Sequence, residues 1–300
     1  MEKPKVSFIT PCYNGEMYLN NFFTSLLSQD YNNVELFFVD DGSTDKTKEI
    51  FNSFAPKLVE KGWSVKYIYK ENGGAASAIN AALHQITGKY FIWPDSDDIL
   101  YSASISQRVK FLEEHPEYGI VSSPFDVVKE DNLGKIVKIW EFPVDDRMFE
   151  HTLNEEQIIW TLGNMVRTEV LFDVIPNKKI PQCQGGQNCQ ILMPIFYKYR
   201  CGYIDKPLAK CVVRSNSHSR TNQKKFLKRR IQMIEIWIKT ILTLQDAGKF
   251  EKIRFIVQVL YRNIVRIIMH YLSLVYCMKK TKKRIILTVL GIKIKFKRKK

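Results

Sequence analysis

The sequence predicts an α/β fold with a doubly wound, mainly parallel sheet, followed by a basic amphipathic helical extension. Three observations support this prediction. Over the first hundred residues, short apolar segments of strand-like composition alternate with segments of helical periodicity. Each strand-like segment ends in a polar cluster, and the carboxyl ends of parallel strands share one edge of the sheet, where such folds bind ligands. The charge of the chain also changes sharply near residue 222.

The individual elements follow from composition and periodicity. The predicted strands are residues 6–10, 34–39, 65–69 and 90–93, and the first two are expected to be buried. The predicted helices of the same region are residues 17–27, a segment capped by Thr44 and Asp45, and residues 75–86 and 102–114. Further along, the pattern predicts strands at 119–123 and 136–140, the second in a hairpin, and helices at 155–162 and 188–199.

The net charge of +15 is unevenly distributed along the chain. Residues 223–300 hold 22 Lys and Arg against three acidic residues, a balance of +19. Residues 1–222 hold 24 basic and 28 acidic residues, a balance of −4. This shift predicts a globular domain over residues 1–222 and a separate basic tail over residues 223–300.

The tail has the pattern of two helices joined by a short turn, at 226–244 and from 252 onward. In the second, apolar residues recur at helical spacing and basic residues occupy another face. A membrane-spanning helix is not expected, because polar residues interrupt this segment at Gln258, Arg262, Asn263 and Arg266. Such a tail predicts docking on an anionic membrane surface, and the alternative is that it packs on the first domain. Nucleic acid is not expected as a partner, since no aromatic-rich RNA motif accompanies the charge.

The first residues and the cysteines indicate the cellular compartment in which the protein is expected. The first residues run directly into a strand-like segment, without the apolar stretch of a secretory signal. The six cysteines are scattered, and no pair has the spacing of a zinc site. We therefore expect free thiols and a cytoplasmic protein, peripheral on the inner face of the cell membrane.

Three carboxylates follow the fourth predicted strand, at Asp95, Asp97 and Asp98. Carboxylates this close repel one another unless a cation lies between them, and oxygen ligands of this kind suit Mg²⁺ or Mn²⁺. The alternative interpretation is a capped turn, in which Asp97 or Asp98 begins the next helix. The residues alone leave both interpretations open.

Two other clusters on the same rim are also ambiguous. Asp40-Asp41-Gly42-Ser43 can be a strand-ending turn, or its carboxylates can accept hydrogen bonds from a ribose or a base. Asn72-Gly73-Gly74 can be a tight turn, or a place where backbone approaches a ligand closely before a helix.

Taken together and in order, these clusters resemble the family 2 glycosyltransferases. The matching motifs are Pro11-x-Tyr13-Asn14, Asp40-Asp41-Gly42-Ser43, Asn72-x-Gly74 with Asn80, and Asp95-x-Asp97-Asp98. The resemblance covers about residues 5–222. It implies a GT-A, Rossmann-like fold and an inverting, metal-dependent hexosyltransferase. Its donor would be a nucleoside diphosphate sugar, usually UDP-linked, and its acceptor a glycan or lipid-linked molecule in surface polysaccharide synthesis.

The resemblance also implies a set of site residues. The residues that would bind the nucleotide sugar are Pro11, Tyr13, Asp41, Asn72, Asp95 and Arg214. Mn²⁺ or Mg²⁺ would be held by Asp97 and by His218, which lies in a stretch similar to the late arginine–histidine motif of the family. Asp97 is therefore also counted as catalytic.

The sequence departs from the family where most inverting members carry a Glu-Asp pair that supplies the general base. The aligned residues here are Gln187 and Asn188, and no Asp or Glu occurs between Val174 and Ile204. An amide can orient an acceptor hydroxyl but cannot take its proton near neutral pH. Asn188 is thus expected to position the acceptor, and the base is left to other acids, with Asp98, Asp173 and Asp205 as candidates.

Two further functions compete with an active transferase. A non-catalytic homologue that binds a nucleotide sugar and acts as a scaffold is favoured by the amide pair and disfavoured by the intact Asp95-x-Asp97. A nucleotidyltransferase can share the fold class, but the motif Asp40-Asp41-Gly42-Ser43 fits that function poorly.

Overall fold

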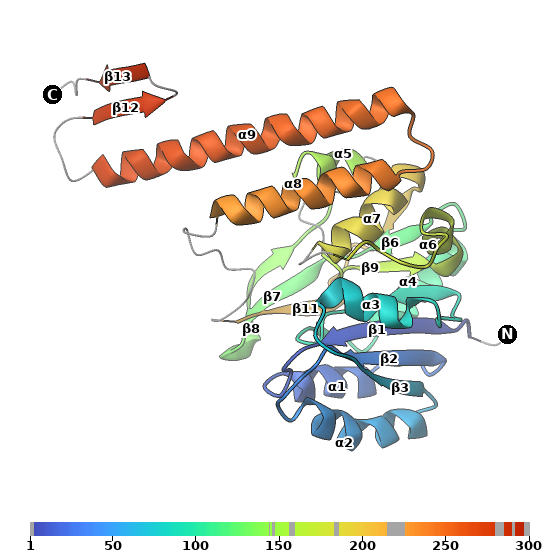
Figure 1. The fold of residues 1–300 in the computed structure, drawn as a ribbon. Coiled ribbons are helices and arrows are strands. Elements are labelled where there is room, and N and C mark those ends of the chain that lie inside the picture. Colours follow the sequence, from blue (N-terminus) through green and yellow to red (C-terminus); the bar gives the residue numbers. More distant parts are fainter. Residues whose placement is uncertain are drawn as a thin grey trace.

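The computed structural model shows an α/β body with two long helices packed along one side of it (Figure 1). Its description covers residues 3–143, 145, 148–155, 160–182, 186–214, 226–279, 285–289 and 292–296.

Within these residues, seven strands form a central sheet in the order β10-β6-β9-β4-β1-β2-β3. Neighbouring strands are parallel except at β9, which is antiparallel to both β4 and β6. The strands are β1 (Val6–Cys12), β2 (Val34–Asp40), β3 (Ser64–Tyr69), β4 (Tyr90–Ile92), β6 (Ile120–Ser122), β9 (Asn164–Arg167) and β10 (Cys201–Tyr203). The predicted doubly wound, mainly parallel sheet is therefore confirmed.

Helices cover both faces of this sheet. The chain moves from β1 to β2 in one direction and from β3 to β4 in the other, so right-handed crossovers place their helices on opposite faces. Figure 1 shows this arrangement, with α3 (Ala75–Leu83) on one side and α1 (Leu19–Leu27) and α2 (Thr47–Glu60) on the other. Every residue of β2 is buried as a result. The N-cap residue of α2 is Lys46, one residue after the predicted cap, and the Asp45 carboxylate just before it accepts a hydrogen bond from the Thr47 amide over 3.0 Å.

A second sheet of four described strands lies beside the first, in the order β5-β11-β7-β8. Its strands are β5 (Ile99–Leu100), β7 (Phe125–Lys129), β8 (Asn132–Trp140) and β11 (Ala209–Val213). The hairpin of β7 and β8 confirms the strand predicted at 136–140. The antiparallel pairing of β11 with β5 was not predicted, and it brings residue 214 beside the polar cluster that precedes Ile99.

The described helices after the first sheet differ in part from the prediction. They are α4 (Ser104–Glu114), α5 (Met148–Leu153), α6 (Thr168–Val174) and α7 (Gln187–Lys198). The helices predicted at 102–114 and 188–199 are confirmed. The helix predicted at 155–162 is wrong for residues 155 and 160–162, which are described and are not helical. The helix of this region is α5, which lies before it, and the left-handed backbone of Glu155, with φ 51°, does not continue a helix. Residues 156–159 lie outside the described part of the chain.

The tail forms a helical hairpin of α8 (Phe226–Thr243) and α9 (Lys249–Lys279), followed by the strands β12 (Ile285–Val289) and β13 (Ile292–Phe296). Helix α8 contacts α7, and α9 contacts α8 and α5. Side chains of both helices, including Trp237 and Phe255, are buried in the same core as the α/β body. The two helices therefore pack on the first domain, as the alternative interpretation of the tail expected. The proposed boundary near residue 222 lies between described segments and stays a prediction. Among the described helices, none is both long and apolar enough to cross a membrane.

Candidate active site

A cavity of about 580 Å³ lies at the carboxyl ends of β1, β2 and β4. Most of the side chains that the sequence analysis proposed for the site line this one cavity. They are Pro11, Tyr13, Asp41, Asn72, Asp95, Asp97 and Arg214. Asn188 does not line it, although its neighbour Gln187 does, and His218 lies outside the described residues. The rim expected from the strand ends thus exists, and the roles of the individual residues stay predictions.

One wall of the cavity is the loop between β3 and α3, and Asp41 holds it in place. The buried Asp41 carboxylate accepts hydrogen bonds from the amides of Gly73 (3.0 Å) and Gly74 (2.7 Å), and it pairs with Lys70 at 2.6 Å. Gly42 has φ +84°, and a Cβ there would lie 2.8 Å from the Asn72 amide nitrogen. The turn therefore needs glycine at position 42. The Asp41 carboxylate fixes the loop that carries Asn72 into the cavity.

The neighbouring wall consists of the segment that leaves β1. Asn14 has φ 50° and ties this segment to the loop after β2, because its amide donates to Ser43 Oγ and its side-chain oxygen accepts from the Thr44 amide, both over 2.9 Å. This brace leaves the Tyr13 side chain 48% exposed at the cavity. An aromatic ring held at a cavity wall offers a flat surface on which a base can stack.

The floor of the cavity is the acidic cluster, defined as Asp95, Asp97 and Asp98. Their candidate ligand oxygens all lie within 4.8 Å of one another. Burial and the neighbouring Asp97 carboxylate raise the pKa of Asp95 to about 7, and the same two causes raise the pKa of Asp98 well above its ordinary value. When all three carboxylates are charged, the cluster therefore carries more negative charge than the described cations around it compensate. An all-oxygen donor set with this excess fits a hard divalent cation.

The alternative interpretation of the acidic cluster, a helix cap, does not match the structure. Helix α4 begins at Ser104 with Ala103 as its N-cap residue, and β5 lies between the cluster and the helix. Instead, the Asp98 amide donates to the Asp95 carbonyl over 3.2 Å and closes a tight turn. The three carboxylates are therefore not used to cap a helix.

Arg214 is the described cation that directly contacts the acidic cluster. Its Nη2 lies 2.5 Å from Asp97 Oδ2, and its guanidinium carbon lies 4.6 Å from the centre of the Tyr18 ring. The pairing of β11 with β5 brings it there. A guanidinium next to a metal-ligand set is well placed to contact phosphate oxygens that share the same metal.

Asn188 lies in the first turn of α7, next to Gln187, which lines the cavity. Trp93 Nε1 donates to its Oδ1 over 3.4 Å, and the helix starts from Gly186 in a left-handed conformation with φ 79°. Of the three acids considered as bases, Asp98 lines the cavity, whereas Asp173 and Asp205 do not. Asp173 is instead paired with Lys198 at 2.7 Å.

Trp160 and Arg229 are among the cavity residues that the sequence analysis did not propose for the site. Trp160 lies in the segment that was predicted as helix, and Arg229 belongs to α8 in the tail. Neither stands in a recognisable motif, and only the packing of distant segments brings them to the cavity.

The fold and the rim define a GT-A-type protein, and comparison with known proteins agrees. Residues 7–175 match the family model described as glycosyl transferase family 2, which is more than half of the chain. The chain belongs to this family.

Relatives in sequence are themselves described as glycosyltransferases. An uncharacterized glycosyltransferase of Rickettsia prowazekii, RP339, is 40% identical over 111 residues, which are 37% of this chain and 33% of the relative. RC0461 of Rickettsia conorii is 39% identical over 211 residues, 68% of this chain and 29% of the relative. The match therefore spans about a third of the length of these relatives.

Solved structures share the fold at low sequence identity. S. aureus TarS 1-349 in complex with UDP-GlcNAc has a TM-score of 0.62 and 21% identity, over 87% of this chain and 73% of that chain. The mannosyltransferase PcManGT from Pyrobaculum calidifontis, in complex with GDP-Man and Mn²⁺, has a TM-score of 0.55 and 21% identity, over 87% of this chain and 74% of that chain. These similarities support the GT-A-like fold.

Proposed function

We propose that this protein transfers a sugar from a nucleoside diphosphate sugar, with UDP as the expected nucleotide, to a glycan or lipid-linked acceptor in surface polysaccharide synthesis. The proposal rests on one observation: the two walls that carry Tyr13 and Asn72, the acidic cluster and Arg214 all line one cavity at the strand ends. Family membership supports glycosyl transfer. The complexes of TarS with UDP and UDP-GlcNAc support a nucleotide sugar as the donor class.

In this proposal the cavity is divided between base, ribose and diphosphate. The residues assigned to base and ribose are Pro11, Tyr13, Asp41 and Asn72, with Asp95 at the ribose or diphosphate and Arg214 at the diphosphate. A bound Mn²⁺ or Mg²⁺, held by Asp97 and by His218, would offset the charge that develops on the departing diphosphate. The excess negative charge of the acidic cluster and the Mn²⁺ in the PcManGT complex both support a divalent cation.

The acceptor side lacks the usual carboxylate base, and we assign Asn188 to acceptor positioning. The scaffold function is the second candidate, because an amide at this position cannot remove the acceptor proton. The fully assembled acidic cluster and its arginine favour a catalyst instead.

The change Asn188→Asp tests this assignment. A carboxylate accepts the same hydrogen bond from Trp93 Nε1, so the side chain should keep its place. General-base help is worth about 10² to 10⁴ in rate, and we expect nucleoside diphosphate release to accelerate by at least about tenfold. The assay measures this release from a panel of nucleotide sugars, with Mn²⁺ and a bacterial lipid extract as the source of acceptor. Asn132→Asp, at an exposed hairpin position, controls for the added charge.

Three outcomes separate the alternatives. A wild type that turns over, is not accelerated by Asn188→Asp and is inactivated by Asp98→Asn, while this variant still binds the nucleotide in Mn²⁺, would place the base at Asp98. A wild type that binds the nucleotide sugar and never turns over, even as Asn188→Asp, would favour the scaffold function. A wild type that neither binds nor turns over any nucleotide sugar would contradict the proposed function.

We also propose that α9 docks the protein on an anionic membrane surface. Exposed apolar side chains recur every three or four residues along α9 and form one stripe, which we call the α9 stripe. Its members are Phe250, Ile253, Val257, Tyr261, Ile264, Ile268 and Tyr271. Buried residues such as Phe255 and Val259 occupy the opposite face, against the body of the protein. The +19 balance of residues 223–300 would add attraction to anionic lipid headgroups.

Vesicle co-sedimentation tests the α9 stripe. We expect binding to phosphatidylglycerol-containing vesicles that weakens with salt, and a loss of at least about tenfold in the double variant Val257→Asp, Ile264→Asp, because each apolar side chain contributes about 1.5 to 3 kcal/mol when buried. Val59→Asp is the matched control, since Val59 on α2 is 56% exposed and Val257 is 58% exposed. Equal binding of the double variant and this control would contradict docking through α9. If deletion of residues 279–300 leaves binding unchanged, the polybasic end is not the anchor.

A further inference from the structure

We propose that the wall of the cavity formed by Trp160, Gln187 and Arg229 is the acceptor subsite and that it takes a phosphate-bearing saccharide. This inference rests on the proposed function and adds the chemical class of the acceptor. We call this surface the α8 wall, because α8 supplies its cation.

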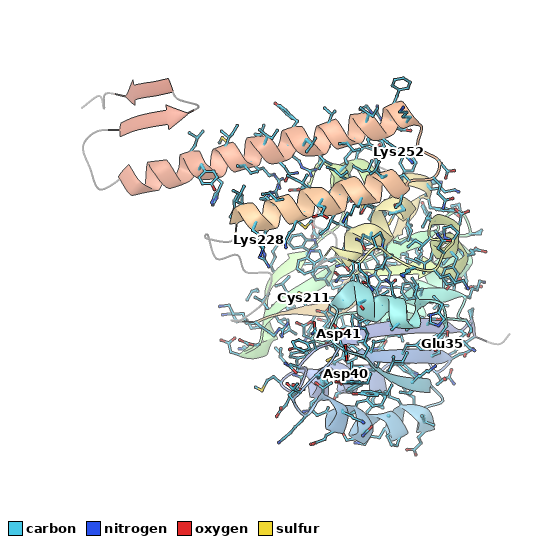
Figure 2. All side chains as sticks on the ribbon, in the orientation of Figure 1. Glu35, Asp40, Asp41, Cys211, Lys228 and Lys252 are labelled. Carbon is cyan, nitrogen blue, oxygen red and sulfur yellow. The ribbon has the colours of Figure 1, made fainter. Side chains whose placement is uncertain are left out.

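The α8 wall lies away from the nucleotide side of the cavity. In the view of Figure 2, Cys211 of β11, which lines the cavity, lies between Asp41, which directly follows β2, and Lys228 at the start of α8. Arg229 follows Lys228 in the first turn of α8. A donor whose base and ribose lie near Asp41 therefore leaves the α8 wall to the molecule that receives the sugar.

The chemistry of the α8 wall differs from that of the rest of the cavity. The described carboxylates that line the cavity are Asp41 and the acidic cluster, and the α8 wall contributes none. A guanidinium binds phosphate through two parallel N–H donors. The faces of an indole ring suit the apolar face of a sugar ring, and an amide can donate to or accept from a sugar hydroxyl. These three groups together match a sugar that carries a phosphate.

The Trp160 ring and the start of α8, which carries Arg229, are held by the packing around them. Trp160 packs against Phe125 and Trp140 in T-shaped arrangements, with ring centres 5.5 Å apart in both cases. Arg230, the residue after Arg229, pairs with Glu155 at 3.2 Å and ties α8 to the turn after α5. The start of α8 is thus fixed relative to the loop that carries Trp160. A site whose side chains are already in place loses less free energy on binding.

Calorimetry with sugar phosphates tests the α8 wall. The protein is first saturated with Mn²⁺ and the nucleoside diphosphate that it binds most tightly, and is then titrated with glucose 6-phosphate, glucose or inorganic phosphate. We expect glucose 6-phosphate to bind at least about tenfold more tightly than either glucose or inorganic phosphate. Arg229→Gln should remove the preference over glucose, and Arg229→Lys should keep part of it. Lys228→Gln is the matched control, because this exposed neighbour loses the same charge outside the cavity.

The nucleotide titration of each variant makes the result decisive. We expect Arg229→Gln to bind the nucleoside diphosphate within about twofold of wild type, which also shows that the variant is folded. If Arg229→Gln weakens nucleotide binding as much as sugar phosphate binding, Arg229 belongs to the donor site and the inference is wrong. Equal affinity of the wild type for glucose and glucose 6-phosphate, with normal nucleotide binding, overturns the inference alone. Absence of nucleotide binding by the wild type overturns the proposed function as well.

Discussion

Asp97→Asn is expected to weaken binding of the nucleoside diphosphate in Mn²⁺ by at least about 100-fold. The substitution removes a charged ligand atom from the acidic cluster, and it also breaks the 2.5 Å pair with Arg214. The shape of the side chain is almost unchanged, so the loss would be electrostatic. Titration calorimetry with UDP measures it, and Asp131→Asn, at an exposed position in the turn before β8, provides the control.

A second readout shows that the variant is folded and that repulsion in the acidic cluster is the cause. The folded-state pKa of Asp95 is raised to about 7, above its unfolded value near 4, so the charged form is less stable in the folded protein. Without metal, the contribution of Asp95 is absent below the unfolded pKa, becomes increasingly destabilising as pH rises through about 7, and is constant above that range. We therefore expect the wild-type melting temperature to fall between pH 5 and 8, and Asp97→Asn to reduce that fall. Unchanged UDP affinity in Asp97→Asn would contradict its assignment as a metal ligand.

Glu155→Gln is expected to destabilise the folded protein by about 3 kcal/mol. The Glu155 carboxylate pairs with Arg262 at 2.9 Å, with Arg230 at 3.2 Å and with Arg266. The side chains of Glu155 and Arg262 are only 15% and 13% exposed. Burial, with the nearby Arg230, already lowers the pKa of Arg262 to about 10. Removing this carboxylate leaves three guanidiniums together without a counter-charge among the described residues, and of the three Arg266 is the one exposed enough to turn to solvent.

Chemical denaturation or thermal melting measures this effect. Glu235→Gln is the matched control, because Glu235 forms an exposed pair with Lys239 on α8, and such pairs contribute less than about 1 kcal/mol. Adding Arg262→Met to Glu155→Gln should restore part of the stability, since it removes surplus charge and keeps a long side chain against Trp237, whose ring lies 5.1 Å from the guanidinium carbon of Arg262. A Glu155→Gln variant as stable as Glu235→Gln would show that the ion pairs of Glu155 do not hold the tail helices on the body of the protein.

The first four strands and their polar ends could be predicted from sequence because their signals are local. The strands β1, β2 and β4 are mainly apolar, as in β2, where every residue is buried. The short strands β5 and β9 have two and four residues, which is too little for a periodic pattern, and they form only because partner strands exist elsewhere in the chain. The helix predicted at 155–162 failed because apolar spacing does not report the left-handed backbone of Glu155.

The residues of the candidate site also divide into those that local sequence signals predict and those that only tertiary packing brings to the cavity. Asp41, Asn72 and the acidic cluster follow predicted strands, so their common rim could be expected from the fold. Arg214 was expected from the resemblance to the family, and its contact with Asp97 depends on the pairing of β11 with β5. Trp160 and Arg229 reach the cavity through the packing of a turn and a tail helix, and no local pattern reports such packing.

The central claim is that the cavity binds a nucleoside diphosphate through a metal held by the acidic cluster. Calorimetric titration of UDP into the wild-type protein, in Mn²⁺ and again in EDTA, tests this claim most directly. We predict binding in Mn²⁺ that weakens by at least about tenfold in EDTA, because the excess negative charge of the cluster repels the diphosphate when no cation is present. Equal UDP affinity in Mn²⁺ and in EDTA would contradict the claim.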